Sequence, residues 1–185
     1  TKGVEIMGID PVRHTRVTNF AQTLYYRADD PADAFRPIYD PNVLGCVFGI
    51  DLDQDGDGDA LATAYFLNTV AWWENTSGVF TQHVISNTFP GAYSVYATDM
   101  DADGDIDVLA AARGSNSIVL FENDGNEAFT EHYITISFAD ASSVHAADMD
   151  DDGDMDIVGA AGIADDIAWW ENDGSENFAQ HIVAT

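Results

Sequence analysis

Three short segments of the sequence contain enough carboxylates to bind a metal ion. Each has an aspartate at relative positions 1, 3, 5, 7 and 9 and a glycine at position 6. Ca²⁺ takes six to eight oxygen ligands at about 2.3 to 2.6 Å, and a curled loop can supply them from side chains and a main-chain carbonyl. Glycine permits the sharp turn that such a loop needs. The aspartates are Asp51, Asp53, Asp55, Asp57 and Asp59 in the first loop, Asp99, Asp101, Asp103, Asp105 and Asp107 in the second, and Asp148, Asp150, Asp152, Asp154 and Asp156 in the third.

Other interpretations of these loops fit less well. Sixteen of the chain's 26 aspartates lie in them, and carboxylates packed this densely would repel one another without a cation, which disfavours a merely solvated acidic face. Magnesium seldom uses a cage this rich in carboxylates. Zinc would require His or Cys. An EF-hand would place a glutamate at position 12, where this chain has Ala62, Ala110 and Gly159. We therefore predict three Ca²⁺ sites.

The acidic loops belong to a tandem repeat. Segments 51–64, 99–112 and 148–161 align without gaps, and their starts are 48 and 49 residues apart. Such self-similarity at a fixed period indicates a repeat architecture. Three landmarks follow each loop in register. The first is a pair of apolar or aromatic residues followed by Glu-Asn, and it ends at Asn75, Asn123 and Asn172. The second is Phe80, Phe129 and Phe178, and the third is His83, His132 and His181.

The sequence of each repeat predicts several short β-strands. Segments 94–98 and 143–147 lead into an acidic loop, 107–112 leaves one, and 117–122 and 129–134 flank the turn signal Asn123-Asp124-Gly125. No stretch shows helical periodicity over ten residues. Four short antiparallel strands in about 49 residues is the pattern of one propeller blade.

Loop and strand pattern together resemble the FG-GAP and VCBS repeat families, in which DxDxDGxxD loops join the first two strands of a blade and bind calcium, as in the propeller of integrin alpha subunits. The resemblance covers about residues 43–185. It implies an all-β fold with three four-stranded propeller-type blades, at about 43–91, 92–140 and 141–185. It also implies ligation by the side chains at positions 1, 3, 5 and 9 and by the carbonyl at position 7, whose side chain we expect to point to solvent.

Charge and composition exclude several functions. The 185 residues carry a formal net charge of −27, and 46% of them are hydrophobic, so a folded core is expected. Nucleic-acid binding needs the Lys and Arg that this chain lacks. The longest apolar run, 43–50, is too short to insert into a membrane as a helix. The single Cys46 excludes an intramolecular disulfide.

The remaining chemistry-bearing residues favour structural roles. The three repeated histidines lie on the last strand of each unit, where hydrogen bonding is the expected role. Adjacent strand residues face opposite ways, so at most one tryptophan of each Trp-Trp pair points to a given surface, and core packing is favoured over a sugar site. No nucleophile motif such as G-x-S-x-G is present, so we expect no enzyme activity.

Residues 1–42 lie outside the repeat and are expected to form an extended N-terminal arm, with strand-like segments at 4–9 and 16–27 and a proline-containing linker. Three blades leave exposed edges, which an arm could cover in its own chain or in a neighbour. We expect a structural and adhesion module that is extracellular or at the cell surface. Its expected partner is another copy of itself, with which it would assemble through open β edges and the arm, including into filaments. The other expected partner is another extracellular protein or a glycan. The alternatives are a calcium-dependent glycan-binding module and a non-catalytic fragment of a larger secreted protein.

Overall fold

The computed structural model describes residues 24–25, 36–37 and 43–184. In the first 42 residues it describes only β1 (Leu24–Tyr25) and β2 (Arg36–Pro37), which pair antiparallel. The predicted N-terminal arm otherwise lies outside the described residues. Within the described part of the chain no helix is long and apolar enough to span a membrane.

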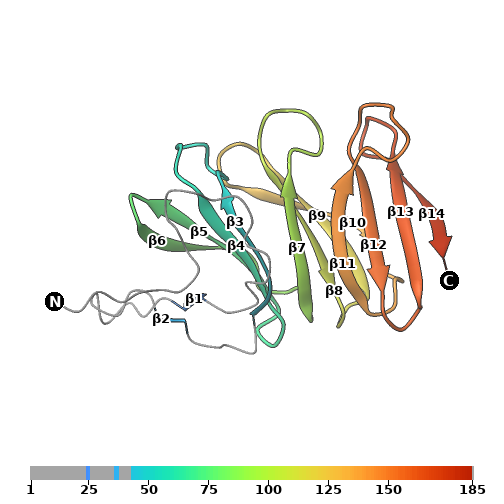
Figure 1. Ribbon diagram of the computed structural model, residues 1–185, viewed down its shortest axis with the longest axis horizontal. Coiled ribbons are helices and arrows are strands. Elements are labelled where there is room, and N and C mark those ends of the chain that lie inside the picture. Colours follow the sequence, from blue (N-terminus) through green and yellow to red (C-terminus); the bar gives the residue numbers. More distant parts are fainter. Residues whose placement is uncertain (1–23, 26–35, 38–42, 185) are drawn as a thin grey trace.

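The rest of the described chain forms three four-stranded antiparallel sheets that stand side by side (Figure 1). Within each sheet the strands are neighbours in sequence order. The first sheet comprises β3 (Val43–Ile50), β4 (Asp59–Ala64), β5 (Thr69–Thr76) and β6 (Val79–Ser86); the second, β7 (Ala92–Thr98), β8 (Asp107–Ala112), β9 (Ser117–Asn123) and β10 (Phe129–Thr135); the third, β11 (Ala141–Ala147), β12 (Asp156–Ala161), β13 (Asp166–Asn172) and β14 (Phe178–Ala184). The prediction of an all-β chain with three four-stranded blades is confirmed.

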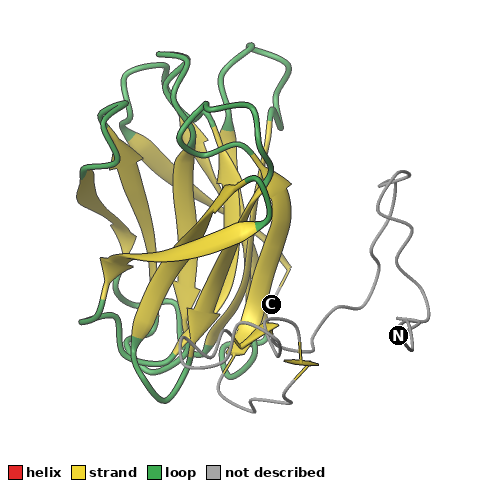
Figure 2. Ribbon diagram, turned by 90° about the vertical axis from the view of Figure 1, so that its left-hand side faces the viewer, coloured by secondary structure: helices red, strands yellow, loops and turns green. Residues whose placement is uncertain are grey.

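The first strands of the blades form the inner side of the array. β7 contacts both β3 and β11, whereas the fourth strands β6, β10 and β14 are the outer edges of their sheets. The acidic loops join the first strand of each blade to the second, and they lie at the same end of the blades (Figures 1 and 2).

Burial decreases from the inner strands to the outer edge. Every residue of β8 is buried, and all but one residue of β9, because both faces of this blade are covered. β14 is exposed over most of its length. The continuous apolar runs at 108–112 and 118–121 therefore reflect two covered faces rather than one.

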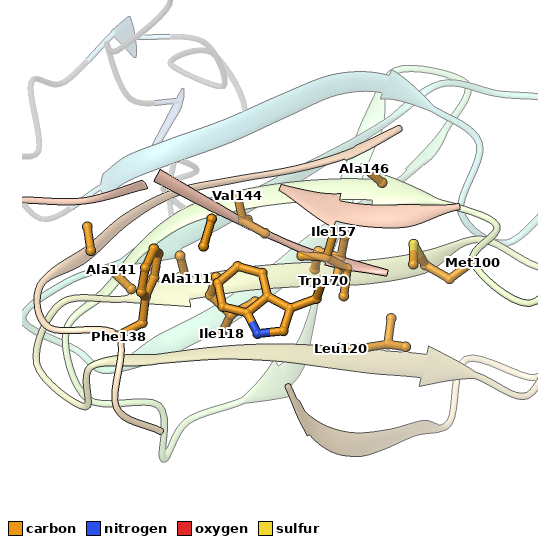
Figure 3. Close-up of a cluster of buried hydrophobic side chains, with 13 residues drawn as sticks. Met100, Ala111, Ile118, Leu120, Phe138, Ala141, Val144, Ala146, Ile157 and Trp170 are labelled. Carbon is orange, nitrogen blue, oxygen red and sulfur yellow. The ribbon is translucent and has the colours of Figure 1, made fainter. Parts of the chain in front are cut away.

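A hydrophobic core lies between each pair of neighbouring blades. Between the first and second blades lie Leu61, Trp72 and Phe121, and between the second and third lie Leu120, Ile157 and Trp170 (Figure 3). Gly159 allows the second and third blades to approach closely, since a Cβ at this position would lie 2.7 Å from the Cδ1 of Ile118 and 3.0 Å from the Trp170 ring.

Candidate calcium sites

Each acidic loop brings three carboxylates together. In each, one oxygen from each of positions 1, 3 and 9 lies within 4.8 Å of the others. The groups are Asp51, Asp53 and Asp59; Asp99, Asp101 and Asp107; and Asp148, Asp150 and Asp156. The carboxylates at position 5 (Asp55, Asp103, Asp152) are outside these groups, so the ligand role predicted for them stays a prediction.

The aspartate at position 9 holds the loop to the sheet. Asp107 is 1% exposed, and its Oδ2 accepts a hydrogen bond from Met100 N while its Oδ1 accepts one from Asn123 N, each at 2.8 Å. Asp59 and Asp156 make the equivalent pairs of bonds at 2.8 to 2.9 Å. Each carboxylate oxygen retains a second lone pair that could face a cation. The position 9 residue thus anchors the loop and contributes to the cluster.

The asparagine of the Glu-Asn landmark is part of the site, a role that sequence reasoning did not assign. Asn75, Asn123 and Asn172 donate their main-chain N–H to the position 9 aspartate. Their side-chain amides also donate to the position 8 carbonyl, at 3.0 to 3.3 Å. The recurrence of Asn at a constant distance from each loop was the available signal. These bonds connect the loop to the third strand of the blade.

Side-chain turns set the curvature of each loop. In the first, Asp53 Oδ1 accepts from Asp55 N at 3.1 Å, Asp55 Oδ1 from Asp57 N at 2.8 Å, and Asp51 Oδ2 from Gly56 N at 3.2 Å. Gly56 has a φ of 97°, in the left-handed region that favours glycine. These alternating aspartates therefore shape the loop as well as carrying its charge.

Position 4 of the loop is also left-handed, which the sequence pattern did not reveal. Gln54, Ala102 and Asp151 have φ of 61°, 62° and 64°. A non-glycine residue rarely adopts this conformation. The backbone strain is retained in all three copies, so the loop geometry requires it.

Two buried oxygens in the clusters have no partner. Asp51 Oδ1 and Asp99 Oδ1 are inaccessible to solvent and make no hydrogen bond. A buried carboxylate oxygen without a partner is costly. A hard cation among these carboxylates would satisfy both atoms, and the all-oxygen donor set matches the preference of Ca²⁺. The residues present therefore fit a calcium ion.

The position 7 side chains of the first two loops were predicted to point to solvent, but they accept hydrogen bonds instead. Asp57 Oδ2 accepts a hydrogen bond from Ser77 N at 2.9 Å, in the turn between β5 and β6. Asp105 Oδ1 accepts one from the Gln54 amide at 3.0 Å, and Gln54 also donates to Gly104 O at 2.7 Å. Gln54 thereby links the first loop to the second. The prediction was wrong because neighbouring turns and loops close over these carboxylates.

Burial and repulsion from neighbouring carboxylates raise the pKa of Asp59 and Asp107. Burial raises the pKa of Asp107 to about 6, and Asp101 and Asp103 add to the effect. Burial likewise raises the pKa of Asp59, with contributions from Asp53 and Asp55. A bound cation would favour the ionised form and oppose these shifts.

Each of the three repeated histidines lies against a glutamate of its own blade. The Nε2 atoms of His83, His132 and His181 are 2.7 to 2.9 Å from a carboxylate oxygen of Glu74, Glu122 and Glu171. His83 also stacks on Trp72 and His181 on Trp169. Glu127 and Glu176, each from the following blade, approach His83 and His132. The expected structural role of these histidines is confirmed for His83 and His181, which form the hydrogen bonds.

The fold and the loops together define a repeat protein with an acidic loop between the first two strands of each blade. The model of the FG-GAP-like repeat family matches residues 51–110 and 99–159. The chain belongs to this family, and the predicted resemblance is confirmed. A comparison with curated proteins finds no match.

Proposed function

We propose that this protein is a calcium-binding structural and adhesion module that acts outside the cell and has no catalytic activity. The FG-GAP-like repeats indicate an adhesion-type repeat module. The observation that carries the calcium assignment is the pair of buried, unpartnered oxygens, Asp51 Oδ1 and Asp99 Oδ1, inside clusters of carboxylates.

Calcium would stabilise the blades by neutralising the loops. Positions 1, 3 and 9 would hold the ion, with the position 5 carboxylate and position 7 carbonyl completing the set. Because the position 9 aspartate is bonded to the asparagine of the third strand, an ordered loop would also order the contact between the second and third strands. The ion is thus proposed as a structural component.

An extracellular setting suits sites of this kind. Extracellular calcium modules work with dissociation constants of about 10⁻⁴ to 10⁻³ M, because the medium is calcium-rich. The described surface also has few cations: Arg113 is the only Lys or Arg after residue 40. Repulsion between such surfaces is reduced when calcium occupies the loops.

Self-assembly is the proposed use of the open edges. In the described part of the chain no further strand pairs with β6, β10 or β14. Unpaired edges are templates for pairing with another chain. Assembly would use these edges and the N-terminal arm, and repeated head-to-tail contacts would give filaments.

Calcium titration of the metal-free protein tests the calcium assignment. We expect a calorimetric stoichiometry of three, reduced to two by Asp99→Asn. Asp124→Asn, in the turn between β9 and β10, is the matched control and should leave three. Absence of binding at millimolar calcium in the folded protein would refute the assignment.

Glycan binding is the alternative function, and the structure narrows the residues it could use. Trp72 and Trp170 are 1% and 2% exposed and belong to the cores between blades. Trp73 and Trp169 are partly exposed. Calcium-dependent glycan-array binding that is lost in Trp169→Ala would favour this alternative over the structural module.

A further inference from the structure

His132 has an environment that the other two repeated histidines lack. Its Nε2 atom is inaccessible to solvent and makes no hydrogen bond, although Glu122 Oε2 lies 2.7 Å away. His83 and His181 do form hydrogen bonds with the equivalent glutamates of their own blades. Among the described residues, the buried side-chain nitrogens and oxygens without a partner are His132 Nε2 and the two oxygens in the calcium clusters. His132 Nε2 is thus in the same situation as the oxygens assigned to calcium.

The cross-strand partner of the histidine accounts for this difference. In the first and third blades the histidine pairs with Trp72 or Trp169 and stacks on its ring. In the second blade His132 pairs with Leu120, which has no ring for stacking. The imidazole of His132 is therefore not held in the orientation in which its equivalents form their hydrogen bonds.

A carboxylate from the third blade completes a cluster around His132. One ring nitrogen of His132 and one oxygen each of Glu122 and Glu176 lie within 4.8 Å of one another. Glu122 pairs with Thr130, so Glu122 and His132 are diagonal neighbours on the same side of the sheet. This side faces the third blade, because Leu120 belongs to the core between the second and third blades. Glu176 enters the cluster from the turn between β13 and β14.

The interface between the first and second blades supplies a comparison. Here Glu74 and Glu127 approach different nitrogens of the His83 ring, Nε2 at 2.9 Å and Nδ1 at 3.6 Å. Two carboxylates on different ring nitrogens cannot share one ion with a single imidazole nitrogen. Among the described residues, no group of three ligand atoms forms around His83. The same residue types therefore gather as a ligand set only around His132.

We propose that His132, Glu122 and Glu176 bind a zinc-type divalent transition-metal ion that links the second blade to the third. Zn²⁺ in proteins is bound by imidazole nitrogens and carboxylate oxygens, the two kinds of ligand present here. The imidazole distinguishes this cluster from the acidic loops, since Ca²⁺ takes oxygen ligands. Three side chains leave one coordination position for water. The site goes beyond the proposed function and does not depend on the calcium assignment.

The charge around the cluster favours a cation. Burial raises the pKa of Glu176, and the charge of Glu122 adds to the effect, whereas His132 opposes it. Asp101 and Asp103 of the second acidic loop raise this pKa further. A dication bound between these carboxylates would be stabilised by their charge. The side chains of His132 and Glu122 are 39% and 34% exposed, so a small rotation of either admits an ion from solvent.

Zinc titration of the full, untagged chain in millimolar calcium tests the proposal, because calcium competes with zinc for the acidic loops. We expect calorimetry to show one Zn²⁺ per chain. Glu176→Gln removes one ligand charge while preserving side-chain size, and it should weaken zinc binding at least about tenfold. Glu127→Gln is the matched control at the equivalent position of the turn between β9 and β10, beside His83, and it should bind zinc like the wild type.

Two further measurements identify the ligands and the link between blades. Zinc should shift the ¹⁵N resonances of the His132 ring and leave those of His83 and His181 unchanged. Because the ligands come from two blades, zinc should also raise the melting temperature of the wild type and of Glu127→Gln, but not that of Glu176→Gln.

Several outcomes would overturn the proposal. Absence of saturable zinc binding in millimolar calcium refutes it. Equal weakening in Glu176→Gln and Glu127→Gln also refutes it, because a general loss of negative charge would then explain both. Zinc shifts of equal size at His83, His132 and His181 would indicate adventitious surface binding only. Each of these failures leaves the calcium assignment standing, since that assignment uses different residues and a separate titration.

Discussion

The second and third blades carry the same landmarks in the same register, yet their surroundings differ. The second lies between two neighbours, and the side chains on both faces of β8 and β9 are buried. The third has a neighbour on one side within the described residues, and its Ile167 and Met149 are 46% exposed. The same repeat pattern thus produces two environments, because burial in a stacked array depends on the next unit.

The acidic loops show the same difference. Asp99 Oδ1 is buried without a partner, whereas the equivalent Asp148 Oδ1 accepts a hydrogen bond from Asp152 N at 3.2 Å. Asp148 and Asp150 are exposed, and no buried oxygen of the third loop lacks a partner. The second loop therefore has more to gain from a cation than the third.

Of the changes predicted here, calcium removal should lower the free energy of unfolding the most. At free calcium about 100 times the dissociation constant, each site adds about 2.7 kcal/mol to the free energy of unfolding, so three add about 8 kcal/mol. Because typical domains have about 5 to 15 kcal/mol in total, excess chelator should unfold or loosen residues 43–184. Thermal melts monitored by circular dichroism measure this. A melting temperature unchanged by chelator would contradict it.

Truncating the equivalent residues Ile118 and Ile167 should distinguish the second blade from the third. Ile118→Ala removes a fully buried side chain and should lower the free energy of unfolding by about 2 to 5 kcal/mol. Ile167→Ala, at a half-exposed position, should cost less than about half as much. Chemical denaturation in calcium, at protein concentrations where the chain is monomeric, measures both. Equal losses would show that Ile167 is covered in the monomer.

Acidification should act on the second loop through Asp107. Its pKa is raised from 3.8 to about 6 in the folded protein. In calcium-free protein, protonated Asp107 therefore contributes to the free energy of unfolding in full below pH 3.8, and this contribution is lost as pH rises through about 6. Calcium-free protein should therefore become more stable between pH 7 and 5. Calcium affinity should fall over the same range, by up to about tenfold per pH unit for one competing proton. Calcium titrations of the wild type and of Asp107→Asn at pH 7 and pH 5 test this. A calcium affinity of the wild type that does not change with pH would contradict it.

Relieving backbone strain in the second loop should have the smallest effect. Ala102 has a φ of 62°, and Ala102→Gly should stabilise the protein by about 0.5 kcal/mol, since the relief of a left-handed alanine is partly offset by greater unfolded-state freedom. Ala111→Gly, in buried β8, is the control and should destabilise. A loss of stability in Ala102→Gly would show that the left-handed conformation costs little here.

Much of the fold followed from periodicity. The segments predicted as strands at 107–112 and 117–122, bounded by an acidic loop and an Asn-Asp-Gly turn, correspond to β8 and β9. The positions 1, 3 and 9 carboxylates meet as the loop pattern predicted. Local spacing was sufficient in these cases because strands, turns and loops of this kind involve residues close together in the chain.

Long-range details were not accessible in this way. The hydrogen bond of Asn123 to Asp107 spans 16 residues, and that of Gln54 to Asp105 spans 51. The left-handed conformation at Ala102 carries no residue-type signal, since alanine does not favour it. Of the strand-like segments predicted at 4–9 and 16–27, only residues 24–25 are described, and they form β1.

The amino-acid sequence by itself determined the repeat, the strand order within each blade and the chemical class of the loops, because these depend on residue type and short spacing. Only the tertiary structure decided which aspartate oxygens are left without a partner and which apolar faces are covered. Both depend on what the neighbouring blade brings within a few ångströms. Ile118 and Ile167 are the same residue at the same position of the repeat, and the packing of the next blade alone distinguishes them.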